Sequence, residues 1–286
     1  MRRVIGFLMG LCLCLCLAAG VRAEAPSSQQ PADVALAAAV ADIDKASAGR
    51  HVILLGEWHG TVQTPALVAQ LVGRVARAHR VPVVLALEIA EDQQASLDAW
   101  MASDGGIEAR QRLLANRHWQ EPHHDGRDSR AMLDMLAAVR TLREQGWDVR
   151  VHAFDHPQAE DRDAAMAGDI RALLAGHPDT RVIVLTGNMH AMTRRPPSAV
   201  RRPPWTVTDA DGRVIEPPVS MGRHLADLAP LSIQVDAVRG QFVACLRACK
   251  VTALLDRSGK AIAGLQETAA DASAWDRVLT LPVLDA

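Results

Sequence analysis

The sequence predicts an α/β protein with a mostly parallel sheet, helices on both faces and a small β-rich extension at the carboxyl end. Short apolar runs recur along residues 50–192, and stretches with helical spacing of apolar residues separate them. This strand-helix alternation is typical of parallel strands covered by helices. The runs lie at 51–56, 83–87, 149–154 and 182–187.

The helices are predicted from apolar spacing and from their end signals. The first is expected over 34–48, with Asp33 placed to cap its start. The second follows Thr64 as cap, with Pro65 at the first helical position. Further helices are expected over 91–101, 107–116, 129–145 and 159–175, and Gly146 ends the helix that begins at 129.

The pattern changes after residue 192. Arginine-proline clusters at 194–197 and 201–204 are typical of loops, and 209–212 is typical of a turn. Apolar runs at 231–238, 241–246 and 250–255 predict strands. We expect 50–192 to form the α/β core and 193–286 to be a β-rich extension of the same domain.

The first 23 residues are typical of an export signal. Arg2 and Arg3 precede an uncharged apolar stretch, and Val21-Arg22-Ala23 fits the small-x-small cleavage pattern. The mature chain is expected to begin at Glu24, with 24–49 as a leader and helix, to be periplasmic or secreted, and to have no membrane span. Leucine precedes each cysteine of the signal, which disfavours lipidation.

Cys245 and Cys249 are the cysteines that remain after cleavage. An oxidising compartment favours a disulfide between them, which at this spacing would need a tight turn. Two buried thiols are the alternative.

Net charge argues against a nucleic-acid partner. Without Arg2, Arg3 and Arg22 the chain has 28 basic and 33 acidic residues, a net charge of −5. Nucleic-acid binding requires a basic face. The partner is expected to be a small molecule, and the sequence does not indicate an oligomeric state.

Residues that can do chemistry follow each of the four apolar runs. Because the carboxyl ends of parallel strands meet at one rim, we expect these side chains to converge there. The residues are Glu57, His59, Glu88, Asp155, His156 and His190.

Each of these residues has a structural interpretation beside the functional one. Glu57 could cap a helix, and His59 could be an incidental loop histidine. The functional interpretation is that the two residues act together, because residues two apart in extended backbone point to the same side. Glu88 could belong to a structural ion pair, such as one with an arginine, because a buried carboxylate needs a partner. His190 could be satisfied by backbone, and Asp155-His156-Pro157 could be a turn.

The loop at 117–128 offers further candidates. His123 and His124 could bind a transition metal, or the loop could be solvated surface or a lid. Trp119 and Trp58 could form an apolar wall for a substrate, and Trp58 could instead pack beneath the rim. The sequence contains no G-x-S-x-G elbow, P-loop, post-strand G-x-G-x-x-G or H-E-x-x-H, which disfavours serine hydrolases, nucleotide-binding proteins and zincins.

These motifs resemble the superfamily that contains ChaN-like haem-binding uptake proteins, erythromycin esterases and Tiki/TraB proteins. The chain shares a Gly-x-x-His at 56–59, a glutamate at 88 and a second Gly-x-x-His at 187–190. The similarity covers about residues 50–192, and 87–94 is most similar to the ChaN branch.

The resemblance implies two kinds of function. In the esterase branch, His59 would be the general base, Glu57 and Glu88 its supports, and His190 a stabiliser of the oxyanion. In the Tiki branch, the same four residues would hold zinc or manganese. The ChaN branch is associated with haem and iron uptake through a tyrosine ligand, but this chain has no tyrosine.

We therefore expect a hydrolase of a small molecule or peptide that activates water at His59, with or without a divalent metal. A periplasmic haem- or metal-binding protein for iron uptake is the alternative. A cell-envelope protein that kept the scaffold and lost the chemistry is the third possibility.

Overall fold

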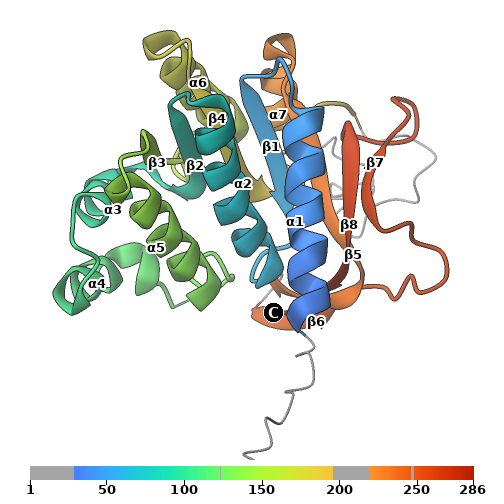
Figure 1. Ribbon diagram of the computed structural model, residues 1–286, viewed down its shortest axis with the longest axis horizontal. Coiled ribbons are helices and arrows are strands. Elements are labelled where there is room, and N and C mark those ends of the chain that lie inside the picture. Colours follow the sequence, from blue (N-terminus) through green and yellow to red (C-terminus); the bar gives the residue numbers. More distant parts are fainter. Residues whose placement is uncertain (1–28, 123, 196–218, 246–247) are drawn as a thin grey trace, which may run out of the picture.

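The computed structural model describes residues 29–122, 124–195, 219–245 and 248–286 (Figure 1). The export signal expected at 1–23, His123 and the turn expected at 209–212 lie outside the described residues, as does most of the arginine-proline segment.

The described residues contain a single eight-stranded sheet. Seven strands follow the order β3-β2-β4-β1-β5-β8-β7, and β6 pairs with β5 off this path. All neighbouring strands are parallel except the antiparallel pairs β7–β8 and β5–β6. The strands are β1 (Val52–Glu57), β2 (Val83–Ala90), β3 (Val149–Asp155), β4 (Arg181–Gly187), β5 (Leu231–Cys245), β6 (Cys249–Ala253), β7 (Gly264–Glu267) and β8 (Arg277–Leu284).

The helices cover both faces of this sheet, as predicted. Successive residues of β1 alternate between two apolar cores: Ile53 packs with α1, α2 and α5, whereas Leu54 packs with α6 and α7. Figure 1 shows α1, α2 and α5 side by side on the front face. The helices are α1 (Gln29–Ala46), α2 (Gln63–His79), α3 (Gln94–Met101), α4 (Ile107–Leu114), α5 (Arg130–Glu144), α6 (Arg162–Gly176) and α7 (Met221–His224), with 3₁₀ turns at Glu91–Gln93, Arg117–Trp119 and Ala226–Leu228.

Two predicted helix starts were wrong. Helix α1 begins at Gln29, so Asp33 lies inside it and does not cap it. Helix α2 begins at Gln63, and its cap residue Val62 makes no side-chain hydrogen bond. Thr64 instead accepts a hydrogen bond from the hydroxyl of Thr61 within the turn. Ser129 does cap α5, accepting from the backbone N–H of Met132.

The strands after residue 219 extend the main sheet. Strand β5 lies beside β1 in parallel, and β8 lies beside β5 in parallel. The runs expected at 231–238 and 241–246 form one long strand, β5, whose distal part turns back into β6. No helix in the described part of the chain is long and apolar enough to cross a membrane.

Candidate active site at the carboxyl rim of the sheet

The sheet order places four strand ends in a row, β3-β2-β4-β1. Glu57 and Asp155 are the last residues of their strands, Glu88 lies near the end of β2, and His190 follows β4. Arg127 forms ion pairs with both Asp155 and Glu88, and Nε2 of His190 lies within ion-pair distance of Glu88. The convergence that the sequence predicts is therefore present.

Glu57 and His59 form a carboxylate–imidazole pair. Oε1 of Glu57 lies 2.9 Å from Nδ1 of His59, and the two side chains are 4% and 24% exposed. Nε2 of His59 lies over Gly187, 3.0 Å from the position that a Cβ there would take. A Cβ at residue 187 would therefore press on this ring and shift it.

Burial acts on both members of this pair. It raises the pKa of Glu57 above its usual range, although the hydrogen bond with His59 opposes the shift. Burial opposes protonation of His59, but its hydrogen bond to Glu57 and the charges of Glu88 and Glu57 outweigh this effect and raise the pKa of the imidazole. Each group therefore holds a proton more tightly than it would in water.

Glu88 is the centre of an ion-pair network. Its Oε1 accepts hydrogen bonds of 2.8 Å from Arg127 and from Arg162. Its Oε2 accepts bonds of 2.7 Å from the hydroxyl of Thr186 and from the backbone N–H of Gly187. The structural ion pair that the sequence left open for Glu88 is thus present, and it involves two arginines.

Charge keeps Glu88 ionised. Burial alone would raise the pKa of this carboxyl, but the charges of Arg127, His190, His59 and Arg162 hold it well below its usual range. Glu88 is therefore a fixed anion between the two imidazoles. The same arginines also bind Asp155, which accepts two bonds from Arg162 at 2.6 and 2.8 Å.

His190 has a carboxylate partner of its own. Its Nδ1 lies 2.8 Å from Oδ1 of Asp163, a buried residue in the first turn of α6. Its Nε2 lies 3.8 Å from Oε1 of Glu88. Burial opposes protonation of the imidazole, but its hydrogen bond to Asp163 and the charge of Glu88 raise its pKa.

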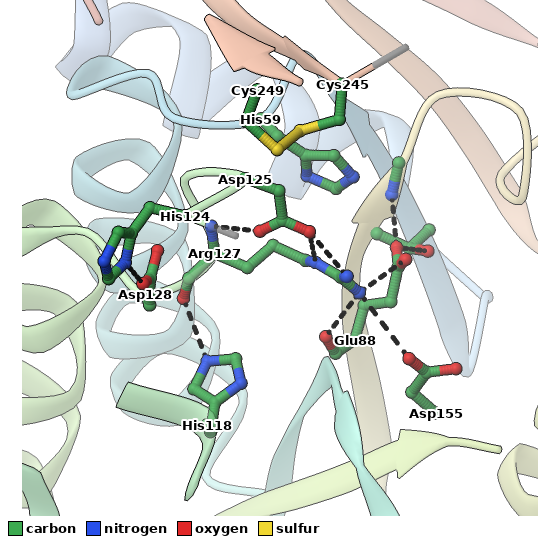
Figure 2. A network of polar contacts seen from close by, with 12 residues as sticks. His59, Glu88, His118, His124, Asp125, Arg127, Asp128, Asp155, Cys245 and Cys249 are labelled. Atoms are coloured by element: carbon green, nitrogen blue, oxygen red, sulfur yellow. Dashed lines mark hydrogen bonds and ion pairs between the residues drawn. A yellow bond between two sulfur atoms is a disulfide. The ribbon is translucent and has the colours of Figure 1, made fainter. Parts of the chain in front are cut away.

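The loop at 117–128 delivers Arg127 to the site. Figure 2 shows Arg127 reaching from this loop between Asp125, Glu88 and Asp155. A Cβ on Gly126, at φ +96°, would overlap Cα of Gly60, and a Cβ on Gly60, at φ +78°, would overlap Cγ2 of Val243. Both positions therefore require glycine.

The disulfide-closed hairpin of β5 and β6 packs against the loop that carries His59. The bond between Cys245 and Cys249 is formed as predicted and joins the two ends of the hairpin (Figure 2). The N–H of Val243 in β5 donates to the carbonyl of His59 at 2.8 Å. The ring of Phe242 lies 4.6 Å from that of Trp58.

Several candidate residues lie outside this constellation. His156 bonds Asp169 at 3.2 Å, and His152 reaches the other oxygen of the same carboxylate at 3.1 Å. His124 is exposed and pairs with Asp128. Trp119 is buried in the apolar core, because the 3₁₀ turn after Asn116 directs it inward, so its predicted place in a substrate wall was wrong. Trp58 packs against that core and Phe242.

The donor set does not fit the metal that the resemblance implies. Among the described residues, no group of three or more His, Cys, Asp or Glu side chains is arranged to hold a metal ion. An ionised carboxylate has about four acceptor sites, and Glu88 uses them on four donors, two of them guanidinium groups. Glu57, His59, Glu88 and His190 therefore do not form a joint ligand set.

The same residues do not fit haem. The chain has no tyrosine, so His59 and His190 would have to supply the iron ligand at this rim. Both rings are largely buried, at 24% and 19% exposure, and their Nε2 atoms face Gly187 and Glu88. An iron ligand for haem needs an open face wide enough for the porphyrin, and these two rings are mostly buried.

Sequence reasoning missed Arg127, Arg162, Asp163 and Thr186. Arg127 lies in a loop that was noted for its histidines, and Thr186 lies inside a predicted strand. The two residues of α6 have one local signal: they stand in the first turn of a helix that starts just beyond the end of β3. Helix starts at this rim are therefore places to search for site residues.

A family model matches part of the chain. Residues 43–149 match the family described as haem-binding uptake, Tiki superfamily, ChaN. This confirms the resemblance over a segment that includes Glu57, His59, Glu88 and Arg127 and stops before His190. No curated protein matches the sequence significantly.

Solved structures share the fold at low sequence identity. A mutant of the erythromycin esterase EreC in its open conformation is 12% identical and has a TM-score of 0.58. The superposition covers 82% of this chain and 91% of the esterase chain. A Bacillus cereus protein has 12% identity and a TM-score of 0.54, covering 91% and 98%. A succinoglycan biosynthesis protein has 9% identity and a TM-score of 0.52, covering 91% and 99%. At such identities the likeness shows the fold alone.

Proposed function

Because residues 43–149 match the ChaN family of the Tiki superfamily and the fold is that of an erythromycin esterase, we propose that the protein is an exported hydrolase. It uses His59 to activate water for attack on an acyl carbon of a small molecule or peptide. Ester or amide hydrolysis is the reaction that needs a base, a polarising donor and no cofactor. The site supplies the first two from its own residues.

The observation that carries this proposal is the Glu57–His59 pair. An ionised carboxylate only accepts hydrogen bonds, so Glu57 holds the proton of the imidazole on Nδ1. Nε2 then carries the basic lone pair and has no hydrogen-bond partner among the described residues. A general base oriented in this way contributes about 10²–10⁴ in rate.

The remaining residues fix this geometry or face the developing charge. His190 lies beside Glu88, with its Nε2 3.8 Å from Oε1, and in its protonated form Nε2 can donate to negative charge that forms on the substrate. Glu88 does not act on the substrate directly, because its oxygens accept hydrogen bonds from Arg127, Arg162, Thr186 and Gly187. It holds the arginine loop and the turn under His59 in place.

Hydrolysis of an ester and peptide panel tests the proposal. We expect His59→Gln to lower kcat/KM by about 10²-fold or more on any substrate that is found. His51→Gln is the matched control, because His51 is exposed and lies just before the opposite end of the same strand. Wild-type rates in His59→Gln would overturn the assignment of the base.

The proposal that the protein is exported is based on the sequence of residues 1–23, and the disulfide is compatible with it. Expression in a bacterial host followed by fractionation should yield a periplasmic protein whose first residue is Glu24. Recovery of the uncleaved chain in the cytoplasm would contradict export.

Capture of haem or metal for uptake is the second candidate, and the description of the matched family favours it. It predicts a Soret band on titration with haemin that shifts in His190→Ala. The orientation of both imidazoles favours hydrolysis, and the absence of a Soret band in protein free of bound haem would remove the haem alternative.

A further inference from the structure

Asp163 is a buried carboxylate that no sequence motif singles out. Its Oδ1 accepts hydrogen bonds from Nδ1 of His190 at 2.8 Å and from the backbone N–H of Met221 at 2.6 Å. The residue belongs to the first turn of α6, whereas Met221 begins α7. Asp163 therefore ties the second histidine of the rim to two helices.

This contact decides which nitrogen of His190 is available. Because Asp163 accepts and cannot donate when ionised, Nδ1 of His190 must carry a proton. Nε2 points toward Glu88 but stays 3.8 Å from its Oε1, which already accepts from Arg127 and Arg162. In the described part of the chain, Nε2 of His190 has no hydrogen-bond partner.

The rim thus contains two carboxylate–imidazole pairs, and both imidazoles lie near Glu88. Glu57 holds His59 and Asp163 holds His190, each through Nδ1, so that both Nε2 atoms are left for a ligand. Hydrolysis of an ester or amide needs a base for the water and an acid for the leaving group. Two oriented imidazoles can divide these tasks.

We propose that Asp163 is a positioning residue that makes His190 the general acid for the leaving group. This inference rests on the proposed function. As Nε2 of His59 takes a proton from water, the water oxygen bonds to the acyl carbon. As the bond from carbon to the leaving oxygen or nitrogen breaks, that atom keeps the electron pair and takes the proton from Nε2 of His190. The products are a carboxylic acid and an alcohol or amine, and solvent then restores both imidazoles.

The arrangement also defines a class of substrate. Proton donation matters for a leaving group that is a strong base, such as an aliphatic alkoxide or an amine, and matters little for a stable phenolate. The Asp163–His190 pair is therefore suited to unactivated alkyl esters or amides. Burial opposes the charged imidazole, but Asp163 and Glu88 raise the pKa of His190, which keeps the acid form available.

Two esters with the same acyl group and different alcohols separate this role from a structural one. Asp163→Asn removes the negative charge that stabilises the imidazolium of His190, and its amide can donate to an unprotonated Nδ1, so the acid form of His190 becomes less populated. We expect kcat for the alkyl ester to fall by about 10²-fold or more, and kcat for the p-nitrophenyl ester to change by less than about threefold. Equal losses on both esters would overturn the acid role.

Asp161→Asn is the matched control. It removes the same charge two residues away on an exposed helix cap, where asparagine caps as well as aspartate. We expect this variant to hydrolyse both esters at wild-type rates, and Asp163→Glu to restore part of the alkyl-ester activity.

A spectroscopic measurement tests the contact between Asp163 and His190 without an activity assay. ¹⁵N NMR of the folded chain, recorded at a pH where the imidazole is neutral, should show His190 protonated at Nδ1 in the wild type and a changed tautomer in Asp163→Asn. An unchanged tautomer would overturn the positioning role even if the enzyme is active. A wild-type chain that hydrolyses neither ester would overturn the proposed function and the acid step, while the tautomer would still report whether Asp163 orients His190.

Discussion

Nδ1 of His59 lies 2.9 Å from Oε1 of Glu57, and the two residues stand on either side of a tryptophan at the end of one buried strand. Their side chains meet because extended backbone places residues two apart on the same side. The carboxylate is buried and the imidazole is mostly buried, so the pair is isolated from bulk water. Its protonation should therefore control activity.

The rate of hydrolysis is expected to rise with pH through a midpoint above 6.5. The pKa of His59 is raised from 6.5, so its basic, neutral form appears only as the pH passes that higher value. In Glu57→Gln the hydrogen bond and charge that raise this pKa are lost, so the midpoint should move to lower pH and the plateau should fall by about 10²-fold. The pH profile of kcat/KM measures both effects.

Glu108→Gln serves as the control for this profile, because Glu108 is 90% exposed on α4. A midpoint that stays in place in Glu57→Gln would show that another group controls the acid limb.

Glu88→Gln is expected to lower the free energy of unfolding by about 3 kcal/mol. Both oxygens of Glu88 face donors, so the amide nitrogen of glutamine would meet a donor in either orientation. Arg127 and Arg162 would also lose the charge that lies between them. Urea unfolding measures the change, with exposed Glu121→Gln as a control expected within about 0.5 kcal/mol.

This difference should depend on pH in a defined direction. The pKa of Glu88 is lower in the folded state than its ordinary 4.5, so its ionised form stabilises the fold above about pH 4.5. That contribution is lost as the pH falls through the lower folded value. The gap between wild type and Glu88→Gln should therefore be constant between pH 7 and about 5.5 and shrink below 4.5; a gap that grows in acid would contradict this assignment.

Gly126→Ala is expected to be more damaging than Gly146→Ala. Both glycines have positive φ, +96° and +89°, so both substitutions introduce backbone strain of about 1–2 kcal/mol. A Cβ at 126 would also overlap the backbone of Gly60, whereas a Cβ at 146 meets nothing within 4 Å. Unfolding free energies and hydrolysis rates of the two variants test this, and equal effects would show that the contact between Gly60 and Gly126 is unimportant.

Reduction of the disulfide is expected to destabilise the hairpin and to lower activity. Cys245 and Cys249 close a short loop, for which the chain-entropy estimate is about 2 kcal/mol. Strand β5 supports the carbonyl of His59 through Val243, so a loosened hairpin should place the imidazole less accurately. The free energy of unfolding and kcat, each measured with and without a thiol-free reductant, test the loss of stability and of activity. The double variant Cys245→Ser/Cys249→Ser should be insensitive to the reductant.

Local pattern in the sequence was sufficient for the core of the fold and for half of the site. Each of the four apolar runs forms a parallel strand, and Glu57, His59, Glu88 and His190 gather at one rim. The sequence also indicated the Cys245–Cys249 bond. The start of α1 was harder to predict, because its alanine-rich sequence offers helix formers on both sides of Asp33.

What the sequence by itself determined is the set of reactive residues that the strands carry, because strand period and burial are local properties and parallel strands must end together. Only the tertiary structure decided what those residues contact. Arg127, Arg162 and Asp163 reach the rim from a loop and a helix start, and the local sequence does not show which carboxylate or imidazole each of them contacts. Long polar side chains find their partners through the folded geometry, and here that geometry makes Glu88 a fixed anion and gives His190 its own carboxylate.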